Sequence, residues 1–307
     1  MHLQNPKAVL MIRPATFFFN EQTAGTNAFQ QQAAANRQQV LAQAQQEFDT
    51  MVDQLRAHHI EVFVVADTPE PEKPDAIFPN NWVSFHHDGR VILYPMMAPN
   101  RRHERRIDIL EWLRQTFIIA EVLDESTYEQ EGKFLEGTGS LIFDHAHQTV
   151  YASRSARTHD ELVTRVASLL SYQPIVFDAV DEQGLPIYHT NVMLWVGSSV
   201  AVVCLDAVHS EADQDALLDS FARAGHRVVA ISYAQMKAFA GNMLEVADAD
   251  GMPYILLSQT AFNSLLPGQI DALSKTADLL PLAVPTIERY GGGSVRCMVA
   301  GIHLQKK

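Results

Sequence analysis

Five polar residues recur along this chain at nearly constant intervals, each at the opening of a predicted β-strand. They are Asn81, Glu136, His189, Asn242 and Cys297, and successive intervals are 55, 53, 53 and 55 residues. Near-constant periods that each contain strands and a helix indicate repeated supersecondary units. Five units are too few for an open solenoid of this length, so we expect them to close radially, like a propeller. The five strand-opening residues would then converge at one end of the axis.

The segments between these residues have the patterns of strands and amphipathic helices. Residues 29–58 carry apolar side chains at helical spacing and predict one long helix, and residues 101–117 predict a second. Asp88-Gly89 between two apolar runs predicts a hairpin with a type I′ turn. Because no proline-rich or Ser/Gly-rich linker separates the units, we expect a single domain over residues 1–307.

The composition argues against several classes of partner. The chain has a net charge of −13, and its only basic clusters are Arg101-Arg102 and Arg105-Arg106. Nucleic acid and anionic membranes are therefore not expected partners. No apolar run approaches the roughly 20 residues that span a bilayer. Two cysteines in different surroundings do not indicate a disulfide framework. We expect a soluble cytoplasmic protein.

The two cysteines lie in contrasting sequence contexts. Cys297 follows the glycine run Gly291 to Gly293 and Arg296, whose guanidinium would favour a thiolate. Cys204 lies inside a continuous apolar strand, as expected for a buried structural cysteine. The glycine run does not have the Gly-Lys-Ser/Thr order of a phosphate loop. We therefore take Cys297 as the candidate nucleophile.

The repeat also places a histidine and a glutamate at positions equivalent to Cys297. Cys297, His189 and Glu136 supply a nucleophile, a proton carrier and a carboxylate that orients the imidazole. Without these partners, His189 would be interpreted as a structural histidine. The remaining histidines, such as His86 and His145, show no spacing typical of zinc ligands. We predict catalysis without metal or organic cofactor.

With these residues in view, the chain resembles the guanidine- and ureido-modifying enzymes of the pentein superfamily. This superfamily includes arginine deiminase, dimethylarginine dimethylaminohydrolase and the amidinotransferases. The resemblance runs from Met11-Ile-Arg-Pro14 to Cys297, and it is strongest to the bacterial branch associated with citrulline utilisation. It implies an α/β fold, a five-bladed αβ-propeller, in agreement with the repeat.

The resemblance also implies roles for individual residues. Cys297 in Arg-Cys-Met matches the nucleophile, His189 in Tyr-His-Thr-Asn the general acid/base, and Glu136 in Leu-Glu-Gly the carboxylate paired with it. Asp75 in Asp-Ala-Ile-Phe matches a residue that hydrogen-bonds the planar head of the substrate. Two arginines match those that hold the α-carboxylate through a bidentate fork. They are Arg102, with Arg101 as the alternative, and Arg157.

The chain departs from the guanidine-hydrolysing relatives at two places. Amides occupy Asn80 and Asn81 in Phe-Pro-Asn-Asn, and Asn191 in His-Thr-Asn, where those relatives have carboxylates. A site for a neutral head group needs fewer carboxylates, and an amide offers both a donor and an acceptor to a ureido group. Asn242 is a further substrate-binding candidate. All four asparagines are equally compatible with turns.

We therefore predict hydrolysis of the ureido group of citrulline, giving ornithine, ammonia and carbon dioxide through a covalent thiol intermediate. The alternatives on the same scaffold are an arginine or methylarginine hydrolase or deiminase, and an amidinotransferase. An alternative of another class is a non-catalytic pentein binding module. The expected partner is a small amino-acid substrate, and a homo-oligomer stays open.

Overall fold

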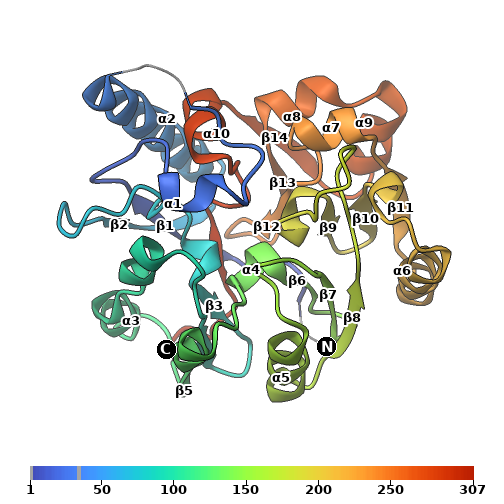
Figure 1. The fold of residues 1–307 in the computed structure, drawn as a ribbon, viewed down its shortest axis with the longest axis horizontal. Coiled ribbons are helices and arrows are strands. Elements are labelled where there is room, and N and C mark those ends of the chain that lie inside the picture. The colour runs from blue at the N-terminus through green and yellow to red at the C-terminus, as the bar shows by residue number, and fades with distance from the viewer. Residues whose placement is uncertain (1–2, 33–35) are drawn as a thin grey trace.

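The computed structural model describes residues 3–32 and 36–307 and contains one three-strand pattern that recurs along the chain (Figure 1). In this pattern the first strand pairs antiparallel with the second, and the second pairs parallel with the third. Three separate sheets have this pattern: β6 (Ile142–Asp144), β7 (Thr149–Ser153) and β8 (Gln173–Phe177); β9 (Leu194–Val196), β10 (Val200–Val203) and β11 (Arg227–Ala230); and β12 (Leu244–Ala247), β13 (Pro253–Ser258) and β14 (Asp278–Leu282).

A fourth, six-stranded sheet contains the same pattern twice. One half combines the two ends of the chain, because the C-terminal strand β15 pairs with β1. The halves join where Ile302 of β15 pairs with Phe85 of β3. The strands are, in sheet order, β2 (Glu61–Ala66), β1 (Ala8–Arg13), β15 (Ala300–Ile302), β3 (Val83–Phe85), β4 (Arg90–Leu93) and β5 (Glu121–Asp124).

The fold is therefore mixed α/β with five three-stranded sets, as the repeat predicts, although two sets share one sheet. Radial closure of the sets into a five-bladed propeller stays a prediction. The longer helices lie around the outside of the sheets in Figure 1. They are α2 (Arg37–Ala57), α3 (Ile107–Leu113), α5 (Asp160–Leu170), α6 (Glu211–Ala224) and α9 (Pro267–Ser274).

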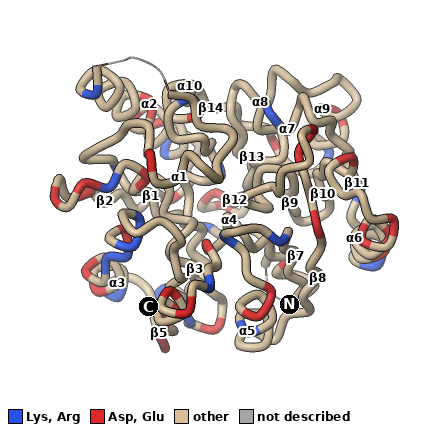
Figure 2. The backbone as a smooth tube through the Cα atoms, viewed as in Figure 1, with Lys and Arg blue, Asp and Glu red and all other residues tan. Residues whose placement is uncertain are grey.

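The outer helices bury one apolar stripe each and expose charged side chains. In α5 the buried residues Leu162, Val163, Val166, Ala167 and Leu170 recur at helical spacing. Figure 2 shows acidic and basic residues side by side on α3, α5 and α6, with no face of a single sign in this view. Of the described helices, none combines the length and apolarity needed to cross a membrane.

Shorter helical turns lie between the sheets or at their ends. Two of them, the 3₁₀ turns at Pro79–Asn81 and Thr190–Val192, directly precede β3 and β9. The remaining α-helices are α1 (Glu21–Ala24), α4 (Gly137–Ser140), α7 (Tyr233–Lys237), α8 (Gln259–Ser264) and α10 (Pro285–Gly291). The five periodic polar residues lie in or beside turns that precede the first strand of a set, rather than in the strands themselves.

Three local predictions differ from the structure. The long helix begins at Arg37, where the Asn36 side chain accepts the Gln38 and Gln39 amides as a cap, and residues 33–35 lie outside the described residues. The second helix spans only Ile107–Leu113, after a 3₁₀ helix at Pro99–Glu104. The hairpin turn is not type I′, because Gly89 has a positive φ but Asp88 does not.

Candidate active site

The turns that precede the strand sets bring the predicted catalytic residues together. Cys297 and His189 line one small cavity with Asp75, Asn81 and two arginines. The complete lining is Asn27, Asp75, Phe78, Asn81, Arg101, Arg157, Tyr188, His189, Gly291, Gly292, Gly293 and Cys297. These residues come from segments far apart in sequence, so the cavity exists only in the folded chain.

Glu136 lies behind His189 and is ionised. Its Oε2 is 2.8 Å from His189 Nε2, and its Oε1 accepts the Met97 amide at 3.1 Å. Burial alone would raise the pKa of Glu136, but Arg157, then His189 and Arg101, outweigh burial and hold that pKa well below its usual range. The carboxylate is therefore in position to orient the imidazole.

His189 is a neutral imidazole at neutral pH. Burial lowers its pKa to about 4, although the hydrogen bond and charge of Glu136 oppose that shift. Gly139 allows the ring its position, because a Cβ there would lie 2.8 Å from His189 Nδ1 and 2.4 Å from Asn81 Nδ2. A neutral imidazole can accept a proton from a thiol and later return it to a leaving group.

The thiol of Cys297 is buried and meets two amide donors. Asn191 Nδ2 and Asn242 Nδ2 each lie 3.4 Å from Sγ. Asn242 also accepts the Arg296 backbone N–H at 3.1 Å, which fixes the orientation of its amide. Two N–H donors can stabilise negative charge on the sulfur once the thiol has lost its proton.

Arg296 interacts with Cys297 through its charge, as expected, rather than through a hydrogen bond to the sulfur. The guanidinium of Arg296 lines a different cavity, and Nη1 donates to the Val299 carbonyl at 3.0 Å. Consecutive residues in the turn that begins at Ser294 point in different directions, so sequence adjacency to Cys297 does not place the guanidinium at the sulfur. The two amides occupy that position instead.

Asp75 presents a carboxylate oxygen to the cavity. Its Oδ2 accepts Asn20 Nδ2 at 2.7 Å and lies 3.7 Å from Arg101 Nε. Its Oδ1 is buried without a hydrogen-bond partner among residues 3–32 and 36–307. Burial raises the pKa of Asp75, and Arg101 opposes that rise. This oxygen is available to a donor that enters the cavity.

Of the two alternative arginines, Arg101 rather than Arg102 lies in the site. Arg101 is bound bidentately by Glu104 at 2.9 Å and donates to Asn81 Oδ1 at 2.9 Å. Arg102 is partly exposed and contacts the Met96 carbonyl and Glu129. Successive side chains of a 3₁₀ helix point about 120° apart, so only one of the two can face the cavity. The assignment to Arg102 is wrong.

Asn80 also differs from its predicted place. It is fully buried but does not line the cavity, and neither atom of its side-chain amide has a hydrogen-bond partner in the described chain. Its carbonyl accepts the Thr138 hydroxyl at 3.2 Å, which links this turn to α4. Asn81 lines the cavity, whereas Asn191 and Asn242 contact the sulfur.

A segment that sequence reasoning missed covers the site. Residues 20–30 contact it at three points: Asn20 on Asp75, Thr23 and Thr26 on Arg157, and Asn27 on the Gly291 carbonyl. The cavity beneath them is about 20 Å³, which is room for one or two waters. The cavity in this structure therefore has no room for a molecule of the size of an amino acid. The polar, irregular composition of residues 20–30 was the only sequence feature that set this covering segment apart.

Other candidate sites lie apart from this cavity. Two larger cavities, of about 670 and 550 Å³, share no lining residue with it. Within the described residues, one group has ligand atoms close enough for a metal ion, namely Asp144, His147 and His226, and none of the three lines the Cys297 cavity. Sequence spacing missed this group because Asp144 and His226 are 82 positions apart.

Comparisons with known proteins identify the family of this chain. The family model of N,N dimethylarginine dimethylhydrolase, eukaryotic, matches residues 13–304. No curated protein matches the chain significantly.

Solved structures share the fold at low identity. ArgZ, an arginine dihydrolase from the ornithine-ammonia cycle in cyanobacteria, has a TM-score of 0.72 and 15% identity over 95% of this chain. The chain spans 40% of full-length ArgZ and 96% of its N-terminal domain. A citrulline complex of the enzyme DDAH from Pseudomonas aeruginosa has a TM-score of 0.64 and 13% identity, over 96% of this chain and 99% of that one. Because the family model covers nearly the whole sequence, this chain belongs to the N,N dimethylarginine dimethylhydrolase family, within the pentein superfamily of guanidino-modifying enzymes.

Proposed function

We propose that the protein is a cysteine-dependent hydrolase that cleaves a C–N bond in the planar head group of an arginine-type amino acid. One observation carries this proposal: Cys297, His189 and Asp75 line the same cavity, with Glu136 2.8 Å behind His189. The set contains a nucleophile, a proton carrier and a carboxylate for the N–H groups of the head. The membership of the family supports the same reaction class.

The chemistry follows from the protonation states of the site. His189, neutral at pH 7 because burial lowers its pKa to about 4, accepts the thiol proton as Cys297 Sγ attacks the central carbon. The imidazolium, held by Glu136, then protonates the departing amine, and the C–N bond breaks. Water activated by His189 adds to the thiol adduct and releases the product and the free thiol.

Asp75 and Arg157 supply the contacts expected for the two ends of the substrate. Asp75 Oδ1, buried and without a partner among the described residues, accepts an N–H of the head group. Arg157 now donates to Thr23 and Thr26 of the covering segment. Movement of that segment would free the Arg157 fork for an α-carboxylate, which it can bind bidentately. Arg101 stays engaged with Glu104 and orients Asn81.

A guanidino substrate, arginine or a methylarginine, is the first candidate. The family to which the chain belongs and the arginine dihydrolases that share its fold support it. The buried carboxylate of Asp75 is compatible with a cation, since an opposite charge nearby offsets the desolvation of a guanidinium.

Citrulline is the second candidate, and a specific observation favours it. The side chains around the sulfur and the cavity include the neutral amides of Asn81, Asn191 and Asn242. Among the described residues that line this cavity, one carboxylate oxygen, on Asp75, is without a hydrogen-bond partner. A neutral ureido group needs no second carboxylate, and its C=O can accept an amide N–H. The Asn81 Nδ2 donor is buried without a partner in the described part of the chain.

The test is a comparison of substrates with the purified protein. Arginine, dimethylarginine and citrulline are each incubated with it, and ornithine, citrulline and ammonia are measured, with Cys297→Ser as the blank. Turnover of any of them supports the reaction class, and turnover of none contradicts it. The ratio of kcat/KM for arginine to that for citrulline then selects the candidate. A polar mismatch in such a site changes this ratio by about 10⁴.

A further inference from the structure

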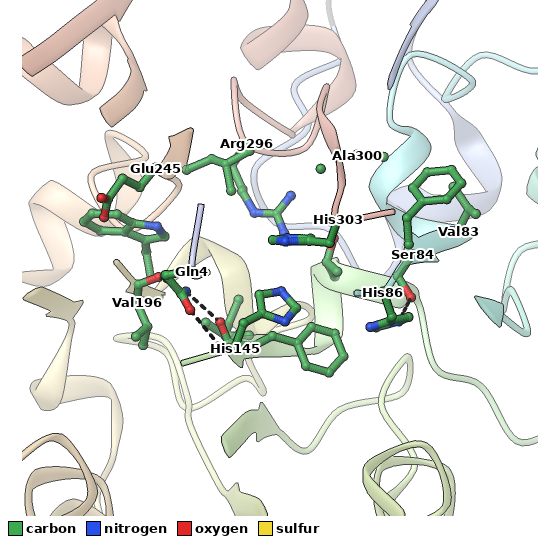
Figure 3. A pocket seen from close by; sticks show the side chains of 17 residues that line it. Gln4, Val83, Ser84, His86, His145, Val196, Glu245, Arg296, Ala300 and His303 are labelled. Atoms are coloured by element: carbon green, nitrogen blue, oxygen red, sulfur yellow. Dashed lines mark hydrogen bonds between the residues drawn. The ribbon is translucent and has the colours of Figure 1, made fainter. Parts of the chain in front are cut away.

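A second cavity, separate from the Cys297 cavity, is lined by residues of a different chemical character. Its volume is about 50 Å³, and it shares no lining residue with the Cys297 cavity. Even so, the two are close along the chain: Arg296 lines the second cavity and Cys297 lines the first. Figure 3 shows Arg296 and the rings of His303 and His145 pointing toward one another in the middle of this second cavity.

Arg296 is a buried cation without a carboxylate partner. Arg296 is 8% exposed, and within the described part of the chain its guanidinium donates one hydrogen bond, to the Val299 carbonyl at 3.0 Å. No ion pair joins it to any described residue, whereas the buried Arg101 and Arg157 both have glutamate partners. Burial lowers the pKa of Arg296 to about 10, although the charge of Cys297 opposes that shift, so Arg296 is still charged at neutral pH. Buried charges are normally paired.

The other side chains that line this cavity add hydrogen-bonding capacity and no free carboxylate. His86 and His303 each have a buried Nδ1 without a partner among the described residues, and Ser84 lies beside His86. The single carboxylate in the lining belongs to Glu245, which is held by Asn5 at 2.6 Å and by Ser198 at 2.7 and 2.8 Å. In Figure 3 the Glu245 carboxylate points away from Arg296.

The geometry points to a binding site for a small inorganic oxyanion, of the class of phosphate, sulfate or bicarbonate, in this second cavity. The Arg296 fork matches two oxygens of such an anion, and neutral imidazoles offer an N–H to others. At about 10–15 Å³ for each water-sized group, a cavity of about 50 Å³ suits a tetrahedral or planar oxyanion and excludes a nucleotide or an amino acid. The site stands independently of the proposed function.

The experiment is a titration of the full chain with inorganic phosphate at constant ionic strength, balanced with potassium chloride. Trp195 lines the cavity, so its fluorescence reports occupancy, and calorimetry gives the affinity independently. We expect a saturable response in wild type and a loss of affinity of tenfold or more in Arg296→Gln. The matched control is Arg227→Gln, which removes an exposed arginine outside the cavity and should bind phosphate as wild type does.

A second variant protects the test against misfolding of Arg296→Gln. His303→Phe keeps an aromatic ring beside His145, whose centroid is 4.0 Å away, but removes both ring nitrogens, and it should also weaken binding. Sulfate and bicarbonate are titrated in parallel, and saturable binding of any of the three oxyanions supports the site. The proposal is overturned if none gives a saturable response up to about 50 mM, which is well above a dissociation constant of about 1 mM, or if both variants bind as wild type does.

Discussion

Both cysteines are buried, but the groups that surround their thiols differ. Cys297 is 3% exposed and Cys204 is 0% exposed, so exposure does not distinguish them. Cys204 belongs to the largest apolar cluster, and burial raises its pKa to about 11. Cys297 faces two amide donors and shares a cavity with His189. The polar groups around a buried thiol, rather than its accessibility, decide whether it can react.

Backbone context explains this difference. The Cys204 amide donates to the Met193 carbonyl, which continues the pairing of β9 and β10. The Cys297 amide donates to the Ser294 carbonyl in a turn that follows Gly292, whose φ is 62°. A side chain at Gly292 would also meet Asn27 and Gln30 of the covering segment within 2.7 Å. The glycine run therefore lets the covering segment and the turn of Cys297 approach each other.

The largest expected effect comes from exchanging each sulfur for oxygen. Cys297→Ser should reduce turnover by about 10³-fold or more, because the hydroxyl is a far weaker nucleophile. Cys204→Ser should retain most activity and lower the unfolding free energy by about 1–3 kcal/mol, since it buries a hydroxyl in an apolar cluster. Steady-state kinetics measures the turnover of both variants, and denaturant unfolding measures their unfolding free energy. Near-normal turnover in Cys297→Ser would contradict the proposal that Cys297, unlike Cys204, is the nucleophile.

The second effect tests whether the network around Cys297 activates it. Glu136→Gln removes the charge that holds His189, and kcat should fall by about 10²-fold or more. The matched control is Asp206→Asn, which removes a carboxylate near Cys204 and should leave kcat unchanged. Circular dichroism establishes that both variants fold. Equal kcat values in the two variants would contradict the view that the Glu136–His189 pair activates the thiol of Cys297.

A smaller effect isolates the amide donors. Asn191→Asp replaces a donor that is 3.4 Å from the sulfur with a negative charge, which disfavours the thiolate and should slow iodoacetamide alkylation of Cys297 at pH 8 about tenfold. Asn263→Asp, an exposed position, is the control for the added charge. Mass spectrometry measures Cys297 and Cys204 in the same sample. An unchanged Cys297 rate would contradict a role for the amide.

Removal of metal ions should not change the rate of turnover at Cys297. The metal-compatible group in the described chain, which includes Asp144 and His226, does not line the Cys297 cavity. Exhaustive chelation should therefore leave the rate unchanged, as expected for thiol catalysis without a metal. The check is the steady-state rate before and after dialysis against chelator. A loss of rate that one added divalent ion restores would mean that a metal, rather than the amides, activates Cys297.

Periodicity in the sequence was sufficient to predict the repeated units and to select the candidate catalytic residues. The intervals from Asn81 to Cys297 are nearly equal because each repeat contains three strands and at least one helix of similar total length. Cys297, His189 and Glu136 were predicted from position in the repeat and from resemblance. The structure places Cys297 and His189 in one cavity, with Glu136 hydrogen-bonded to His189.

Side-chain direction within the turns was decided only by the tertiary structure. Sequence adjacency suggested the Arg296 guanidinium at the thiol and Arg102 in the site, but the turns direct that guanidinium to the second cavity and Arg101 to the first. The covering segment of residues 20–30 has no periodic pattern, so its contacts with Asp75 and Arg157 were not predictable. Local pattern determines which elements form, because it depends on neighbours in sequence. The direction of a single side chain depends on packing between segments that are far apart in sequence. Thr26 and Arg157, for example, are in contact although they are separated by 131 positions.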